Sequence, residues 1–414
     1  MAWHGILGIV ALLSLAWACS EKRAAVPWLL VASGVVLQVV VAMVVLRVEP
    51  VEHAFAALNT LVEAIETAAR AGTAFVFGYA GGGDVPFEVA NPQNTFILAF
   101  QGLPIILLVS ALSALLFHWG ILPAIVRGFA WALRKILGLG GSVGFASAAN
   151  VFVGMIEAPL LIRPYLRGMS RAGLFMVMTA GMATISGNMF VLYATILAPV
   201  VPDAAGNLLT ASLISAPAAV AVAALMVPGT GKGDLAEALA PAERTGSALE
   251  AVVDGTAEGV KLVISVAAIL VVAIALVSLA NQMLDLFPAV GGAPLTLQRI
   301  LGWGMMPVAW LLGIPWNEAL TAGELLGTKV VLNELVAYLD LAALPADALS
   351  EQSRLILTYA ICGFANLGSL GILLGGLGAM IPDRRADIVA LGPKALLSGN
   401  LASFMTGAVV GIVA

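Results

Sequence analysis

Long apolar runs separated by short polar turns extend along the whole of this chain. About 20 apolar residues in a helix are enough to cross the hydrocarbon core of a bilayer. The uninterrupted runs lie at residues 5–19, 25–46, 95–117, 208–227, 260–279 and 388–413. The pattern therefore predicts an all-α polytopic membrane protein. The first run is interpreted as a membrane helix, because the next one follows almost at once, and a cleaved signal peptide is the alternative.

Polar interruptions occur twice, in the same order along the chain. A short apolar segment that carries a glutamate comes first, a longer run broken by polar residues follows it, and an intact run closes each copy. The interrupted segments are residues 147–166 and 174–200 in the first copy and residues 318–341 and 355–377 in the second. A repeated order of this kind is typical of secondary transporters.

The two glutamate-bearing segments are predicted to be re-entrant hairpins. Non-helical backbone is tolerated at that depth only where it lines a cavity or is buried in protein. Residues 293–316 are rich in Gly, Pro and Trp and are predicted to lie at the membrane interface. An odd number of crossings then separates the two copies, so they form inverted repeats with both hairpin tips near the midplane.

Two further segments are predicted to support this arrangement. Apolar residues recur at helical spacing between residues 49 and 72, which predicts an amphipathic helix in the interface without a chemical role. Residues 260–279 are almost free of polar groups and are expected to serve as scaffold or oligomer contact, while residues 228–259 form a solvated loop or surface helix.

The chain is predicted to divide into four regions. They are residues 1–140 (N-terminal helices, interfacial helix and scaffold), 141–228 (first repeat), 229–316 (polar loop, scaffold helix and interfacial segment) and 317–414 (second repeat).

The composition excludes a soluble protein and several classes of function. Of the 414 residues, 61% are hydrophobic and 10% are charged, whereas soluble domains carry roughly 25% charged residues. The net charge of −5 is small, so no nucleic-acid partner is expected. The three histidines are far apart in sequence, which argues against a histidine metal site.

Glu157 and Glu334 are the first candidates for chemistry. A carboxylate at membrane depth is costly unless it faces a cavity or a partner. We expect the two to accept hydrogen bonds from a polar substrate or to help bind a coupling cation. The structural alternative is that each forms an ion pair, with Lys329 the nearest partner in sequence.

Other polar residues at the interruptions suit a substrate and a cation. Asn366 and Ser369 are one helical turn apart and suit a substrate rich in hydroxyl groups, although a helix–helix hydrogen bond is the alternative. The oxygens of Asn150 and Thr184, with carbonyl groups freed by the interrupted backbone, are ligands that a small hard cation such as sodium prefers. Capping of the hairpin helices explains them equally well.

Four apolar residues lie at the same interruptions. They could pack on a flat ring, but core packing is the simpler interpretation. These residues are Met155, Ile156, Met189 and Phe364.

Several motifs resemble the signature of the concentrative nucleoside transporter family, and they follow the same order over nearly the whole chain. They are NVFVG at residues 150–154, EAPLLIRPYL at 157–166, GTK at 327–329, LNE at 332–334, VAYL at 336–339 and CGFAN at 362–366. The resemblance implies a bacterial inner-membrane homotrimer with eight membrane helices, two re-entrant hairpins and several interfacial helices. It also implies sodium- or proton-driven uptake of nucleosides by an elevator-like movement of the hairpin-bearing domain.

The resemblance implies roles for individual residues as well. By position, Glu334, Asn366 and Ser369 resemble the ribose-binding residues, and Glu157 with the two residues before it resembles the base-binding tip. Phe364 and Met189 fall where neighbouring pocket residues sit. The implied sodium site consists of Asn150, Val153, Thr184 and Ile185, and its intact pattern favours sodium over a proton as the coupling ion.

One departure from the family pattern concerns the base. The family usually carries Gln and then Thr or Ser before the tip glutamate, but this chain has Met155 and Ile156. A polar base edge left unpaired in a buried site costs about 1–3 kcal/mol. The sequence therefore predicts intact ribose recognition, with a base preference shifted towards purines or base contacts made through water.

Three alternatives accompany this leading interpretation. The chain could be a proton-coupled member of the family, or it could carry a different polar solute on the same fold. An intramembrane hydrolase that uses Glu157 and Glu334 as an acid/base pair is the third alternative. It is disfavoured, because the sequence has no nucleophile motif and no HExxH motif.

Overall fold

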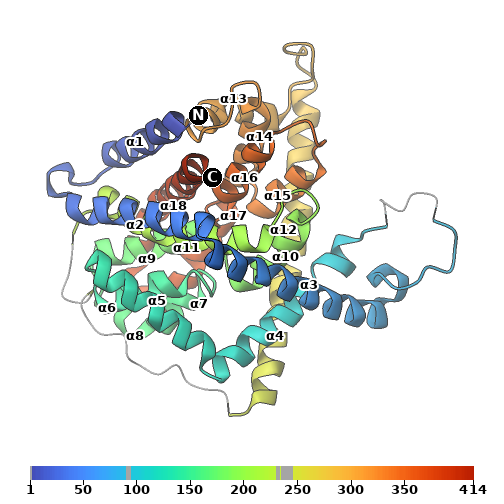
Figure 1. Ribbon diagram of the computed structural model, residues 1–414, viewed down its shortest axis with the longest axis horizontal. Coiled ribbons are helices and arrows are strands. Elements are labelled where there is room, and N and C mark those ends of the chain that lie inside the picture. The colour runs from blue at the N-terminus through green and yellow to red at the C-terminus, as the bar shows by residue number, and fades with distance from the viewer. Residues whose placement is uncertain (1, 90–94, 230–233, 235–245) are drawn as a thin grey trace.

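The apolar runs fold into helices, as the computed structural model shows for residues 2–89, 95–229, 234 and 246–414 (Figure 1). Within these residues the regular structure is helical, and β-structure is limited to one isolated bridge between Val290 and Ala293. Six helical segments there are long and apolar enough to cross a membrane, and the helices at residues 3–18 and 367–380 are apolar but shorter. The all-α prediction is confirmed, and the six candidate spans support a polytopic membrane protein.

The N-terminal third contains helices that pack around the two repeats. They are α1 (Ala2–Ala18), α2 (Trp28–Arg47), α3 (Glu49–Phe77), the π-helical turn η4 (Leu98–Gly102), α4 (Ile105–His118) and α5 (Ile121–Leu137). The run predicted at residues 95–117 starts later than expected and is not one regular helix. Pro104 lacks an N–H group and its ring clashes with the preceding turn, so the α-helix begins after it.

The first repeat contains a helical hairpin, a broken helix and an intact helix. Its elements are α6 (Gly141–Ala149), α7 (Glu157–Leu161), α8 (Arg163–Leu166), α9 (Arg171–Ala183), α10 (Gly187–Leu197) and α11 (Ala204–Met226). The hairpin begins at Gly141 and not at residue 147 as predicted from the apolar run. The small residues of α6 are almost all buried, so the helix extends through a segment that looks like a loop in sequence.

The second repeat has the same order of elements and follows a long helix and a short one. The elements are α12 (Ala248–Leu284), α13 (Leu297–Leu311), α14 (Ala319–Val331), α15 (Glu334–Ala343), α16 (Glu351–Ile361), α17 (Leu367–Met380) and α18 (Arg385–Val413). Part of the predicted polar loop is helical, because α12 begins at Ala248 with Ser247 as its N-cap. Residues 230–233 and 235–245 of that loop lie outside the described residues.

The two broken helices begin at opposite ends of α18. At its start, Asp387 forms an ion pair of 3.3 Å with Arg171, the first residue of α9. At its far end, Ala414 lines the same cavity as Glu351, the first residue of α16. The copies therefore run in opposite directions, which is the arrangement expected of inverted repeats.

Burial separates the helices of the centre from those of the rim. The span in α11 is 89% buried, whereas that in α12 is 6% buried. Figure 1 shows α11 and α18 among the packed helices and the long α12, in yellow, running from the bottom to the top of the view. The exposed side chains of α12 are mostly apolar, so this helix presents a surface suited to lipid or to another protein.

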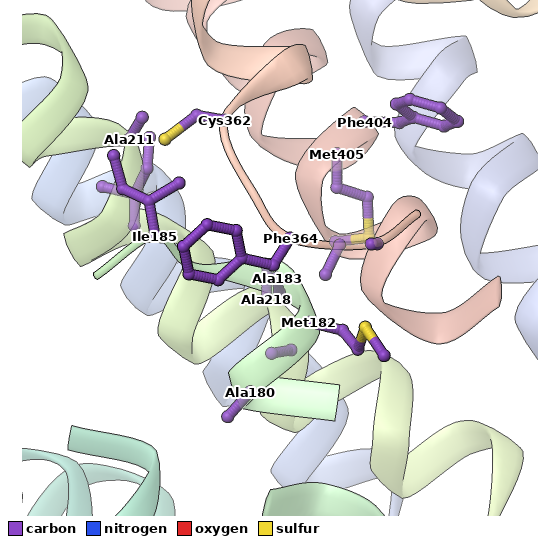
Figure 2. Close-up of a cluster of buried hydrophobic side chains, with 14 of the residues drawn as sticks. Ala180, Met182, Ala183, Ile185, Ala211, Ala218, Cys362, Phe364, Phe404 and Met405 are labelled. Atoms are coloured by element: carbon purple, nitrogen blue, oxygen red, sulfur yellow. The ribbon is translucent and has the colours of Figure 1, made fainter. Parts of the chain in front are cut away.

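The breaks of the two broken helices lie against each other. The backbone N–H of Phe364 donates to the carbonyl of Thr184 at 3.3 Å, and Figure 2 shows the Phe364 ring beside Ile185. Gly363 has a φ of +147°, and a Cβ there would lie 2.6 Å from Ser403 Oγ. Glycine is required at this position for the two breaks to meet.

Close packing of α13 against α14 also depends on a glycine and leads to a prediction. A Cβ at Gly323 would lie 2.5 Å from the carbonyl oxygen of Gly302 and 3.0 Å from the backbone nitrogen of Met306. Because backbone atoms cannot yield, we expect Gly323→Ala to destabilise the protein by about 1–3 kcal/mol. A lower thermal melting temperature in detergent would reveal the loss.

Gly304 of α13 provides the matched control, because a Cβ there would meet no heavy atom within 4 Å. Gly304→Ala should leave the melting temperature unchanged or raise it, since alanine is the better helix former. Equal shifts in the two variants would contradict the packing argument.

Candidate functional site

A cavity of about 160 Å³ lies where the hairpin tips, the helix breaks and α12 meet. Every residue predicted to bind substrate lines it. These residues are Met155, Ile156, Glu157, Met189, Glu334, Phe364, Asn366 and Ser369. Segments that are far apart in sequence therefore form one site, and Glu157 and Glu334 face a shared void.

Glu334 is the most buried acid in the cavity, with 4% of its surface exposed. It is the first residue of α15, which begins where Asn333 caps the helix by accepting from the N–H of Val336 at 2.9 Å. Its Oε1 accepts a hydrogen bond from the Tyr193 hydroxyl at 2.6 Å, and its Oε2 accepts one from Asn366 Nδ2 at 2.8 Å. Donors from both repeats therefore satisfy this carboxylate.

Glu334 does not form the direct ion pair with Lys329 that was the structural alternative. In the described part of the chain, no ion pair within 4.0 Å joins it to Lys329. Lys329 instead donates to Asn400 Oδ1 at 2.5 Å. The buried carboxylate depends on neutral donors for its direct contacts.

Hydrogen-bonding capacity remains at this end of the cavity. A carboxylate has about four acceptor positions, and Tyr193 and Asn366 occupy one each. The Ser369 hydroxyl, on the first turn of α17, makes no side-chain hydrogen bond to the described residues. These groups can together bind at least two hydroxyl groups of a ligand.

The arrangement of Asn366 and Ser369 differs from the predicted helical face. Asn366 is the N-cap of α17, and its Oδ1 accepts from the backbone N–H of Ser369 at 2.7 Å. The side-chain amide can then donate to Glu334 through Nδ2. The break in the helix is therefore what directs Asn366 towards the carboxylate.

Glu157 occupies a different environment in the same cavity. It is the first residue of α7 and is exposed, and it forms no ion pair with the described residues. Its carboxylate thus lies at the accessible side of the cavity, where solvent or a polar ligand can reach it.

Apolar side chains line the rest of the cavity. Met155, Met189 and Phe364 are each more than 90% buried, and Ile156 lies beside them at the first hairpin tip. Helix α12, which we expected to be scaffold or oligomer contact alone, contributes a wall from Leu262, Val266, Ile269 and Leu270. The site is therefore polar at the Glu334 end and apolar along the side that a flat ring would contact.

The four predicted cation ligands lie around the first hairpin tip and the first break. Thr184 Oγ1 lies 2.8 Å from the carbonyl oxygen of Asn150, to which it can donate. Asn150 Nδ2 donates to the carbonyl of Ala146, while its Oδ1 is buried without a hydrogen-bond partner among the described residues. Val153 and Ile185 belong to the non-helical segments on either side.

This set of oxygens fits a sodium ion. A buried oxygen without a donor costs free energy, and a bound cation would satisfy Asn150 Oδ1. The Thr184 hydroxyl has lone pairs left after donating its single proton. The described residues hold no cluster of three or more His, Cys, Asp or Glu side chains, so a cation there would depend on neutral oxygens.

Sequence reasoning missed Tyr193, which lines the cavity and is fully buried. Its only signal is a hydroxyl in the middle of an apolar run, and that signal does not identify a partner 141 residues away. It also missed the α12 wall, because an apolar side chain looks the same in sequence whether it faces lipid or a ligand.

Three family models match the chain. Na+ dependent nucleoside transporter N-terminus matches residues 7–80, nucleoside recognition (Gate) matches residues 99–200, and Na+ dependent nucleoside transporter C-terminus matches residues 207–411. The three matches follow one another along most of the chain.

Individual proteins are similar over their whole length. The chain is 34% identical to the uncharacterized transporter YutK of Bacillus subtilis, covering 99% of this chain and 98% of that one. It is 33% identical to the nucleoside permease NupC of Helicobacter pylori, covering 98% and 96%. The solved structure of CNTnw in an inward-facing substrate-bound state superposes with a TM-score of 0.89 at 33% identity, covering 100% and 98%.

These relatives are transporters and permeases, which excludes the hydrolase alternative. The matches extend over the same hairpins and breaks that form the cavity. The chain belongs to the concentrative nucleoside transporter family.

Proposed function

We propose that this chain is a sodium-coupled symporter that imports nucleosides. The observation that carries the proposal is the cavity. It combines a buried carboxylate that has free acceptor positions with an apolar wall against which a flat ring can pack. A nucleoside has the matching chemistry, because its ribose bears hydroxyl groups and its base is a flat ring.

The two ends of the cavity divide the recognition of a nucleoside. Glu334 accepts hydrogen bonds from ribose hydroxyls, and Asn366 and Ser369 complete this end. Met155, Ile156, Met189 and Phe364 pack against the base. Glu157, at the accessible side of the cavity, accepts hydrogen bonds from the base edge.

A sodium ion is the proposed coupling ion. Asn150 and Thr184 would hold it with side-chain oxygens, and Val153 and Ile185 with carbonyl groups. When bound, the ion supplies a positive charge that neutral oxygens from the first hairpin and the first break can share. The unpaired Asn150 Oδ1 supports a cation at this place over capping alone.

The membrane arrangement follows from the same proposal. The two helical hairpins are re-entrant, eight membrane helices cross the inner membrane of a bacterial cell, and regions 141–228 and 317–414 are the two repeats. The repeats move against a scaffold that includes α4 and α12, in an elevator-like manner, and the chain assembles as a homotrimer. The low burial of α12 supports its place in such a scaffold.

Uptake into proteoliposomes, with sodium and pH varied independently, tests the proposal. We expect radiolabelled nucleoside to accumulate unchanged when an inward sodium gradient is present and not when a proton gradient is the only driving force. Accumulation with a proton gradient alone would show a proton-coupled member. Failure of all nucleosides to accumulate would contradict the proposed substrate.

A matched pair of variants at Thr184 ties the coupling ion to its site. Thr184→Val removes the hydroxyl at nearly constant shape and should raise the half-saturating sodium concentration by about tenfold, which corresponds to about 1.4 kcal/mol. Thr184→Ser keeps the oxygen and should stay near wild type. The same sodium dependence in both variants would place the ion elsewhere.

Tyr193 provides a prediction about the ribose end. Hydrogen bonds to charged groups contribute about 1.5–3 kcal/mol, so Tyr193→Phe should weaken nucleoside binding by roughly tenfold or more. Isothermal titration calorimetry of purified protein measures this. Tyr338→Phe is the control, because the Tyr338 hydroxyl donates to the carbonyl of Thr358 and not to Glu334. If both variants bind as wild type does, the Tyr193 contact does not position Glu334 for substrate.

The base end provides a separate prediction. Met155 and Ile156 offer no polar group to a base edge, so we expect adenosine and inosine to compete better than uridine for uptake. Met155→Gln with Ile156→Thr should move the preference towards uridine. Uridine competing better than both purine nucleosides in the wild type would refute the shift.

A further inference from the structure

Lys329 is a fully buried cation next to the proposed ribose site. Its ammonium group donates to Asn400 Oδ1 at 2.5 Å and lies 5.6 Å from the centre of the Phe404 ring. An ammonium has three donors, and Asn400 is the one hydrogen-bond acceptor that it contacts in the described structure. Such a charge is costly in a protein interior unless an opposite charge compensates for it.

Asn400 connects this cation to the break before α17. Its Nδ2 donates to the carbonyl of Ala365 at 3.0 Å. The next residue, Asn366, donates to Glu334 Oε2 at 2.8 Å. A continuous chain of hydrogen bonds and backbone therefore leads from Lys329 to Glu334.

Lys329 and Glu334, the two ends of this hydrogen-bonded connection, lie on the two arms of the second hairpin. Lys329 is near the end of α14, and Glu334 begins α15. The pair flanks the hairpin tip, and the connection through Asn400 closes a ring that includes the break. Movement of the tip away from the break would have to open this ring.

The charges around Glu334 make Lys329 its natural counter-charge. Lys329 precedes Glu334 by five residues at the same hairpin tip and is connected to it through Asn400 and Asn366, although no ion pair within 4.0 Å joins the two in the described structure. In the described structure the other titratable groups around Glu334 are Tyr193 of α10, Tyr338 of α15, Cys362 of the break and, in the same cavity, Glu157. None of these four side chains carries a positive charge in any protonation state.

We propose that Lys329 is the internal counter-cation of Glu334 and that, through Asn400, it positions the ribose end of the cavity. This role rests on the proposed function. A nucleoside is neutral and brings no counter-charge, so Lys329 supplies the positive charge that compensates Glu334 while Glu334 accepts ribose hydroxyls. Lys329 acts through Glu334 and Asn400, so it is a positioning residue.

A double-mutant cycle tests the charge balance. Lys329→Met removes the charge at similar length and should lower the melting temperature, because it leaves Glu334 as an uncompensated buried charge. Combining it with Glu334→Gln removes both charges, so the double variant should recover much of that loss. Melting-temperature changes that simply add in the double variant would overturn the proposal.

Nucleoside binding supplies a second readout. We expect Lys329→Met to raise the Kd for nucleoside at least about tenfold, which is the effect of losing a hydrogen bond to a charged group. Lys261→Met is the control, because Lys261 is exposed on α12 and forms an ion pair with Glu258 of the same helix. This variant should bind nucleoside as the wild type does. Wild-type affinity in Lys329→Met would also overturn the proposal.

The outcomes remain distinguishable when a variant fails to fold. If Lys329→Met aggregates, monodisperse protein from the double variant supports the charge balance, and aggregation of both overturns it. If the wild type itself binds no nucleoside, the proposed function fails, while the melting-temperature cycle still decides whether Lys329 compensates Glu334.

Discussion

The constraint on which this structure depends is a carboxylate held in the interior of a membrane protein. Glu334 is almost fully buried, and its oxygens must have donors because water is scarce at that depth. Tyr193 supplies one donor from the first repeat and Asn366 supplies the other from the second. The carboxylate therefore joins the two repeats, and its position requires both broken helices to be in place.

Backbone groups that the breaks free form hydrogen bonds with other segments of the fold. The N–H of Phe364 donates to Thr184, and the N–H of Gly187 donates to the carbonyl of Phe152 at the first hairpin tip. Each break is thus stabilised by a segment from elsewhere in the fold. Asn150 Oδ1, beside the first break, is one of the buried side-chain oxygens that have no hydrogen-bond partner among the described residues, and this supports the cation proposed there.

Sequence reasoning predicted the parts of the site that contrast with their surroundings. Glu334 and Asn366 are polar residues within apolar runs, and their repetition at similar spacing identified the hairpins and breaks. Tyr193 could not be identified as a donor to Glu334, because its partner depends on how the repeats pack. The wall from α12 and the start of α6 at Gly141 were missed for a related reason: an apolar or small residue gives no sign in sequence of which surface it faces.

The two ends of the cavity differ in how firmly their geometry is fixed. The polar end, proposed to bind ribose, is held by Glu334, Asn366 and their donors, all within the core that the repeats share. The apolar end, proposed to bind the base, is formed by residues of the first hairpin tip and by α12, which is the least buried of the six candidate spans in the described residues. Apolar contacts are not directional, so the base end can accept rings of different shape while the hydroxyl contacts stay the same. Under the proposed function, specificity for the sugar and specificity for the base depend on separate parts of the fold, so Met155 and Ile156 can alter base preference without altering sugar recognition.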